Sequence, residues 1–114
     1  MALMTPQAVT VGLTGTSIGL TGTFTTPTTS DTLPGGDNVF LYVKVGGTAT
    51  TITLVRQVPS NFGDLVNIVS TSLTSVDKLI GPLNAAQGLI APATGLVTVL
   101  YNQVTAVTSA AFVF

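Results

Sequence analysis

The sequence predicts an all-β protein, a single two-sheet β-sandwich of jelly-roll-like form with about eight short strands. Valine, isoleucine and threonine are abundant, and these residues favour strands over helices. Glycines and prolines divide the chain into short runs, as they do in sandwiches and barrels. The 114 residues have room for one domain, 1–114, in which residues 1–7 are expected to form an N-terminal arm.

The expected strands follow from runs of β-branched and aromatic residues between turn signals. In chain order they cover residues 8–13, 17–25, 38–45, 48–56, 66–73, 77–80, 95–101 and 104–114. In the region of the first two expected strands, the motif GLTGT occurs at 12–16 and again at 19–23. A seven-residue offset would turn the second copy to the opposite face of a continuous strand, so a turn or bulge is expected between the copies.

Alternation is clearest in residues 38–45. One face carries only aliphatic residues, and the other carries Phe40, Tyr42 and Lys44. Gly46 and Gly47 predict a tight hairpin to the next strand. Because both faces are apolar or aromatic, the strand either lies centrally between two covered faces or contributes to a subunit interface, and we assign Phe40 and Tyr42 to an oligomer interface.

Residues 64–80 are ambiguous. Their apolar residues fall near helical spacing, but the segment is interrupted by Ser and Thr and is rich in β-branched residues. A strand is favoured, and a helix remains the alternative.

The composition excludes several classes of protein. Charged residues make up 6% of the chain, and the formal net charge is −1. Three isolated cations are poorly suited to neutralising nucleic-acid phosphates. No apolar run is long enough for a membrane-spanning helix, and the first residues, MALMTPQAV, lack the basic start of a signal peptide. The low charge and the mean hydropathy of +0.66 instead suggest a surface that other subunits cover.

The chain lacks the usual reactive groups. It contains no histidine, cysteine or glutamate, and its acids are four aspartates. Asp31 and Asp37 flank an LPGG turn and are expected to cap or stabilise it. Serines and threonines without a general base are only hydroxyl groups. No catalytic, cofactor-binding or metal-binding residue is predicted, and the protein is not expected to be an enzyme or to need a cofactor.

The order of features resembles that of capsid decoration (cement, or minor capsid) proteins of tailed bacteriophages. The resemblance lies in the turn Asp-Thr-Leu-Pro at 31–34, the strand VFLYVKVGG at 39–47, the strand TATTITLV at 48–55, the Ile-Gly-Pro-Leu segment at 80–83 and a closing hairpin at 95–114. It covers most of the chain from residue 31 onward. The low charge and the GLTGT echo depart from the pattern.

The resemblance implies a β-sandwich subunit, commonly a homotrimer, on the exterior of a virion, where it would clamp neighbouring subunits of the major capsid protein. The N-terminal arm is the expected capsid contact; its residues are Ala2, Leu3, Met4, Thr5 and Pro6. The alternatives are another phage structural part, such as a head-completion, tail or fibre subunit, and a secreted carbohydrate-binding adhesive module. No nucleic-acid or membrane partner is expected.

Overall fold

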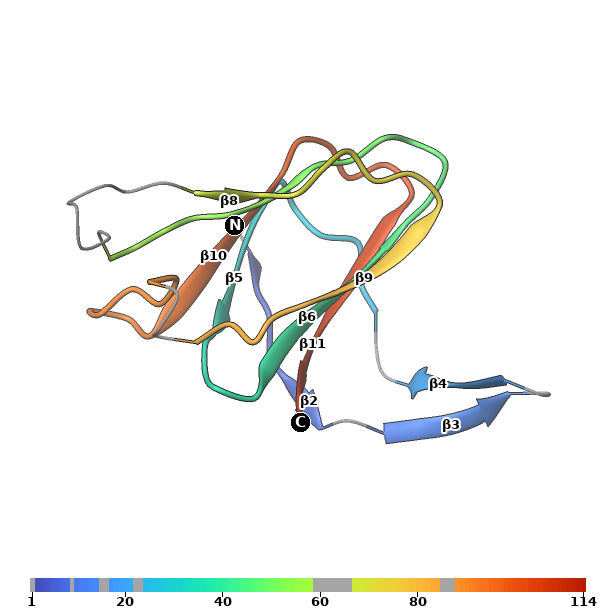
Figure 1. Cartoon of the computed structure of the whole chain (residues 1–114), viewed down its shortest axis with the longest axis horizontal. Helices are drawn as coiled ribbons and strands as arrows, with labels where there is room; N and C mark the ends of the chain where they lie inside the picture. The colour runs from blue at the N-terminus through green and yellow to red at the C-terminus, as the bar shows by residue number, and fades with distance from the viewer. Residues whose placement is uncertain (1, 9, 15–16, 22–23, 59–66, 85–87) are drawn as a thin grey trace.

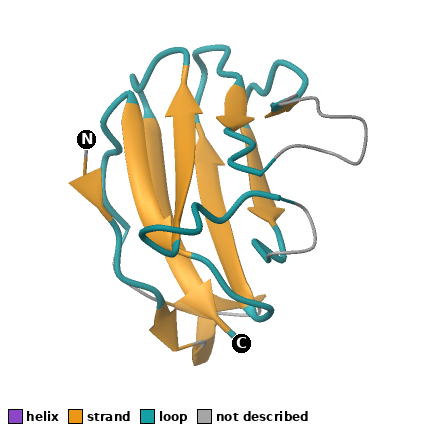
Figure 2. Cartoon of the chain, turned by 90° about the vertical axis from the view of Figure 1, so that its left-hand side faces the viewer, coloured by secondary structure: helices purple, strands orange, loops and turns teal. Residues whose placement is uncertain are grey.

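Two β-sheets packed face to face make up most of the molecule. The computed structural model describes residues 2–8, 10–14, 17–21, 24–58, 67–84 and 88–114 (Figure 1). These residues form eleven strands and no helix (Figure 2). One sheet has five strands, the other has four, and a separate sheet has two. The predicted all-β, two-sheet sandwich is confirmed, with more and shorter strands than expected.

The four-stranded sheet has the order β2-β11-β6-β9. Its central strand β6 shows strict alternation, with its odd-numbered residues buried against the other sheet and Phe40 and Tyr42 half-buried on the outer face. This confirms the two faces that the sequence predicts for the strand. The bounds of the four strands are β2 (Gln7–Ala8), β11 (Val107–Val113), β6 (Val39–Val45) and β9 (Val76–Ile80).

The five-stranded sheet has the order β1-β5-β10-β7-β8. Strand β5 covers residues that the sequence suggested were a turn. Its Asp31 is buried within the strand, and its carboxylate accepts hydrogen bonds from the backbone N–H and the hydroxyl of Thr28. The bounds are β1 (Ala2–Leu3), β5 (Ser30–Pro34), β10 (Leu96–Tyr101), β7 (Ile52–Leu54) and β8 (Ile68–Val69).

The ambiguous segment is extended where the structure describes it. It contributes β8 to one sheet and β9 to the other, so the helical alternative is wrong for residues 67–80. Residues 64–66 of that segment lie outside the described residues.

The chain crosses between the sheets where hairpins were expected. Strand β6 pairs with β11 and β9, whereas β7 pairs with β10 and β8 in the other sheet, so the hairpin predicted at residues 46–47 is wrong. The prediction of a closing hairpin at residues 95–114 is also wrong, because β10 and β11 belong to different sheets. Gly46 serves close packing: a Cβ there would lie 2.7 Å from the Cβ of Ala106.

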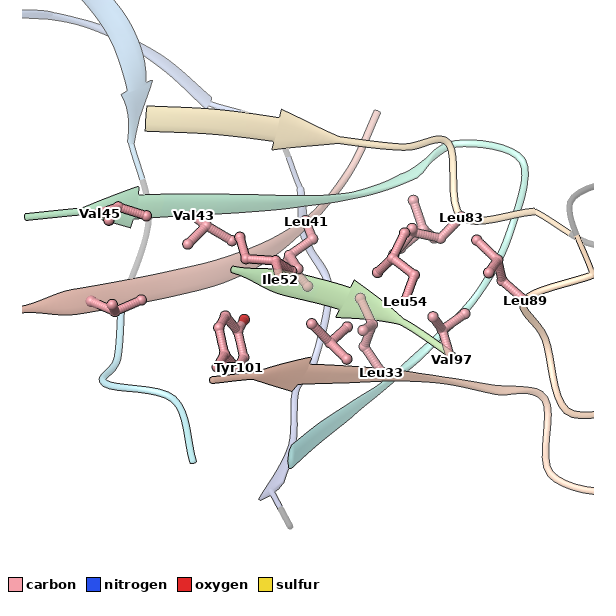
Figure 3. Packing of buried hydrophobic residues seen from close by; sticks show 14 of the residues in the cluster. Leu33, Leu41, Val43, Val45, Ile52, Leu54, Leu83, Leu89, Val97 and Tyr101 are labelled. Carbon is pink, nitrogen blue, oxygen red and sulfur yellow. The ribbon is translucent and has the colours of Figure 1, made fainter. Parts of the chain in front are cut away.

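The core lies between the two sheets (Figure 3). It is built from aliphatic residues that both sheets turn inward, and Tyr101 is the one aromatic member of the cluster. Leu83 and Leu89, which lie outside the strands, close one end of it and are fully buried. The members carried by strands are Leu33, Val39, Leu41, Val43, Val45, Ile52, Leu54, Val97, Val99, Tyr101, Val107 and Ala111.

The N-terminal segment joins one edge of each sheet. Strand β1 runs parallel to β5 in one sheet, and β2 runs parallel to β11 in the other. Between them, the N–H of Met4 donates to the carbonyl of Thr32 at 2.7 Å, and the Met4 side chain packs against the core. The predicted arm is therefore paired with the sandwich at residues 2–4 and at residue 7.

Strands β3 (Thr10–Thr14) and β4 (Ser17–Thr21) form the two-stranded sheet, which projects from the sandwich (Figure 1). Thr14 pairs with Ser17, so the chain reverses as expected in this region, but at the end of the first GLTGT copy and not between the two copies. The register pairs Gly12 with Gly19. Among the described residues, neither strand of this hairpin pairs with a strand of the sandwich.

Candidate interaction surfaces

The outer face of the four-stranded sheet carries a cluster of aromatic side chains. We call this cluster the aromatic surface. Strands β6 and β11 supply most of its members, and Phe24 reaches it from the segment that follows β4. Its members are Phe24, Phe40, Tyr42, Phe112 and Phe114. The chain has five Phe and two Tyr residues, so the surface holds five of the seven.

The rings pack mainly edge to face, the arrangement that aromatic quadrupoles favour. Phe24 lies 5.6 Å from Tyr42 and 5.9 Å from Phe112, measured between ring centroids. Phe40 lies 4.9 Å from Phe114. Thr25, directly after Phe24, exchanges two backbone hydrogen bonds with Ser109 of β11, which holds Phe24 over the sheet. Phe112 is fully buried beneath its neighbours.

Polar groups at the margin of the aromatic surface are engaged within the chain. The Lys44 ammonium lies 4.1 Å from the centroid of the Phe24 ring, a cation–π contact. The Tyr42 hydroxyl donates to Asp77 at 3.1 Å. Burial, the hydrogen bond to Asp77 and the charge of Asp77 all raise the pKa of Tyr42. Tyr42 therefore stays neutral at physiological pH and offers an uncharged contact.

Apolar side chains beside the aromatic surface remain accessible. Leu79 of β9, whose Cα pairs with that of Tyr42, is 46% exposed. Phe114 is 53% exposed at the other end of the surface. The outer face of an antiparallel sheet in a soluble monomer is usually polar. This face has the composition of a contact surface.

The predicted capsid-contact residues lie at the edge that the N-terminal segment closes. Leu3 is 65% exposed, whereas Met4 is partly buried against the core. Pro6 lies between β1 and β2, where the segment passes from one sheet to the other. Gln7, directly after it, pairs in register with Phe112, so the arm meets the edge of the aromatic surface.

A groove of about 410 Å³ opens beside the N-terminal segment. The groove is lined by that segment, by Thr25 and Thr26, and by residues of β5 and β11. We call it the edge groove. Its lining residues are Leu3, Met4, Thr5, Gln7, Thr25, Thr26, Asp31, Ser109, Ala110 and Ala111.

Three buried side chains with polar groups, Asp31, Ser109 and Tyr101, lie near one another in this part of the interior. Asp31 is 2% exposed, Ser109 1% and Tyr101 4%. Among the described residues, neither the Ser109 hydroxyl nor the Tyr101 hydroxyl has a hydrogen-bond partner of normal geometry. Burial raises the pKa of Tyr101 to about 12; a side-chain contact with Ser109, outside normal hydrogen-bond geometry, opposes this rise, and the charge of Asp31 adds to it. Figure 3 shows the Tyr101 ring directed into the interior.

Among the residues that the structure describes, no group of three or more His, Cys, Asp or Glu side chains could hold a metal ion. No helix in the described part is long and apolar enough to cross a membrane.

The structure brings together Phe40 and Tyr42, the two residues predicted for an oligomer interface, and adds three rings to them. Phe112 and Phe114 could have been found from the sequence, because they alternate along the last strand as Phe40 and Tyr42 do along β6. Phe24 could not, since the sequence does not show that the segment around it lies beside β11. The groove residues Asp31 and Ser109 could not either, because only the pairing of distant segments makes them neighbours.

The chain matches no family model, no curated protein and no solved structure.

Proposed function

We propose that this protein is a structural subunit of a tailed-phage virion that decorates the exterior of the capsid and clamps neighbouring subunits of the major capsid protein. The resemblance in the order of sequence features supports this proposal. So does a surface that is rich in apolar contact area and poor in charge. A subunit of this kind needs strands and contact faces and does not need reactive side chains.

The observation that carries the proposal is the aromatic surface. On this outer face Phe114 and Leu79 are exposed and Phe24, Phe40 and Tyr42 are partly exposed, so a free monomer would leave this apolar area in contact with water at a cost. Aromatic residues are enriched at protein contacts and dominate their energies. We assign this surface to contacts between copies of the chain in a homotrimer, with Phe40 and Tyr42 at its centre.

The N-terminal segment is the proposed capsid contact. Leu3 is exposed next to the edge groove, and residues Ala2 to Pro6 form the part of the sandwich that an adjacent capsid subunit would cover. Backbone pairing of β1 and β2 with the sandwich holds the segment in place, so binding would require little further ordering of the chain.

The experiment is to analyse particles from cells that carry the gene. Mass spectrometry of purified virions should detect the protein, and cryo-electron microscopy should place it on the outer capsid surface at threefold or quasi-threefold positions. Density at the tail or at the head–tail junction would replace decoration with another structural role. Its absence from purified particles would overturn the proposal.

A second experiment tests the arm. Particles lacking the protein are mixed with the purified protein or with a variant in which Leu3 and Thr5 are both changed to Asp. The substitutions keep the backbone pairing of β1 but place charge on the proposed contact. We expect lower occupancy of the particles and an unchanged oligomer. Equal occupancy by the two proteins would show that the arm makes no contact.

A further inference from the structure

The edge groove leads to a buried carboxylate. Asp31 faces the interior from β5, on the same side of the strand as the core residue Leu33, and its side chain lines the groove. A buried ionised carboxylate normally has a cation or a set of hydrogen-bond donors as partners. Here Thr28 supplies two donors, both to the same oxygen, Oδ1. The groove lining contains no lysine or arginine.

A second observation points to a ligand in the same place. Ser109 lines the groove and is 1% exposed, and its hydroxyl has no hydrogen bond of normal geometry among the described residues. The Tyr101 hydroxyl lies near the charge of Asp31 and beside Ser109, and its contact with Ser109 falls outside normal hydrogen-bond geometry. Unpaired buried hydroxyl groups cost free energy, and a bound donor would remove that cost.

We propose that the edge groove binds a primary ammonium group on an alkyl chain, as a lysine side chain of another protein presents it. The ammonium would pair with the Asp31 carboxylate and donate to the Ser109 hydroxyl. The alkyl chain would lie against the apolar part of the lining, which includes Met4, Ala110 and Ala111. The volume falls within the roughly 300 to 1,000 Å³ of small-ligand sites.

The chemistry of the groove favours an ammonium over other cations. A guanidinium binds best to two free carboxylate oxygens, and Oδ1 of Asp31 is already occupied by Thr28. Calcium prefers six to eight oxygen ligands, several of them carboxylates, and the lining offers one carboxylate. An ammonium is a compact point charge with three donors, which suits one carboxylate and nearby hydroxyl groups.

The inference does not depend on a virion role, because it rests on the groove alone. Its test uses three probes with the purified protein: n-butylammonium, the lysine analogue Nα-acetyl-lysine N-methylamide, and n-butanol as an uncharged control. Binding is followed by the backbone amide shifts of residues 31 and 109–111 in two-dimensional NMR spectra. We expect saturable shifts with the two amines and none with n-butanol.

Matched variants identify the carboxylate. Asp31→Asn removes the charge in the groove, whereas Asp37→Asn removes the same charge from an exposed turn. We expect at least about tenfold weaker amine binding for Asp31→Asn, as for loss of a charged hydrogen bond, and unchanged binding for Asp37→Asn. If Asp31→Asn does not fold, Thr26→Trp at the exposed rim provides an independent test, since it should block entry and leave Asp31 in place.

Several results would overturn the proposal. They are equal shifts with n-butanol and n-butylammonium, unchanged binding to the Asp31→Asn or Thr26→Trp variant, and no saturable binding of either amine. The last is expected if water alone satisfies the buried hydroxyl groups. Binding of n-butylammonium together with the lysine analogue supports a protein side chain as the natural ligand. Binding of n-butylammonium alone supports a free alkylamine.

Discussion

Single residues of the aromatic surface differ in how much they contribute to the fold. Phe112 is fully buried between Phe24 and Tyr42, although it lies on the outer face of its sheet. Phe114, two residues further, contacts Phe40 and is 53% exposed. One ring therefore stabilises the subunit, and the other is free to stabilise contacts that the subunit makes.

This difference predicts unequal effects of two matched substitutions. Phe112→Ala should lower the free energy of unfolding by about 3 to 5 kcal/mol, the usual cost of removing a buried Phe side chain. Phe114→Ala should cost about 1 kcal/mol, because it removes one edge-to-face contact. Chemical denaturation of both variants measures the difference. Equal losses would mean that the aromatic surface does not have the burial described.

The two tyrosines predict how stability depends on pH. Burial raises the pKa of Tyr101 from 10.0 to about 12, and that of Tyr42 is also raised. A raised acid pKa favours the protonated folded state, so this stability is complete below pH 10.0 and is lost as the pH rises toward about 12. With no histidine in the chain, stability should be nearly constant between about pH 6 and about pH 8.

The Tyr101→Phe variant isolates the contribution of the buried phenol. Its hydroxyl lacks a hydrogen-bond partner, so its removal should change stability little at neutral pH. The variant should lose less stability than the original protein between pH 10 and pH 11.5, measured by denaturant unfolding. A loss equal to that of the original protein would place the Tyr101 hydroxyl in solvent.

At the scale of elements, the sequence predicts which residues are extended more reliably than it predicts which strands pair. Alternation in 39–45 and turn residues on either side locate β6, because side-chain burial alone dictates that pattern. Pairing depends on contacts between segments far apart in the chain, and β6 pairs with β11 across about sixty residues. Strand β5 was not predicted because its Asp and Pro are typical of turns, and the sequence does not show that Thr28 donates to the buried Asp31 carboxylate.

The projecting hairpin should be dispensable for folding. Strands β3 and β4 pair only with each other, and an isolated two-stranded hairpin is marginally stable in water. Replacing residues 10–21 by a short Gly-Ser linker should leave a cooperative thermal transition within a few degrees of the original. A matched replacement of residues 2–8, which pair with both sheets, should lower the transition clearly. A large loss from the hairpin deletion would reveal a structural role.

For the molecule as a whole, scarcity of charge is the dominant property. The 114 residues include only three cations and four aspartates. Of these, Lys44 contacts the Phe24 ring and Asp77 accepts a hydrogen bond from Tyr42. The chain, projecting hairpin included, extends over 49 × 28 × 22 Å, and with so few charged residues most of its outer surface is uncharged. The contacts that we propose between copies would therefore depend chiefly on apolar burial.

We therefore expect a homotrimer whose association depends little on salt. Exposed ion pairs contribute only about 0 to 1 kcal/mol each, so few such pairs can make the equilibrium salt-sensitive. Sedimentation equilibrium at about 50 and about 500 mM salt should give association constants that agree within about tenfold. A monomer at micromolar concentration would contradict the assignment of the aromatic surface. A steep loss of association with salt would indicate an ionic contact instead.

The position of β11 within its sheet has a consequence for biosynthesis. Ribosomes deliver β2, β6 and β9 before β11, yet β11 lies between β2 and β6. A nascent chain that ends at residue 106 can pair β6 with β9, but it leaves β2 without the neighbour that joins it to this sheet. Completion of the four-stranded sheet must wait for translation of residues 107–113, so we expect products truncated before β11 to be less stable than the full chain and more open to proteolysis.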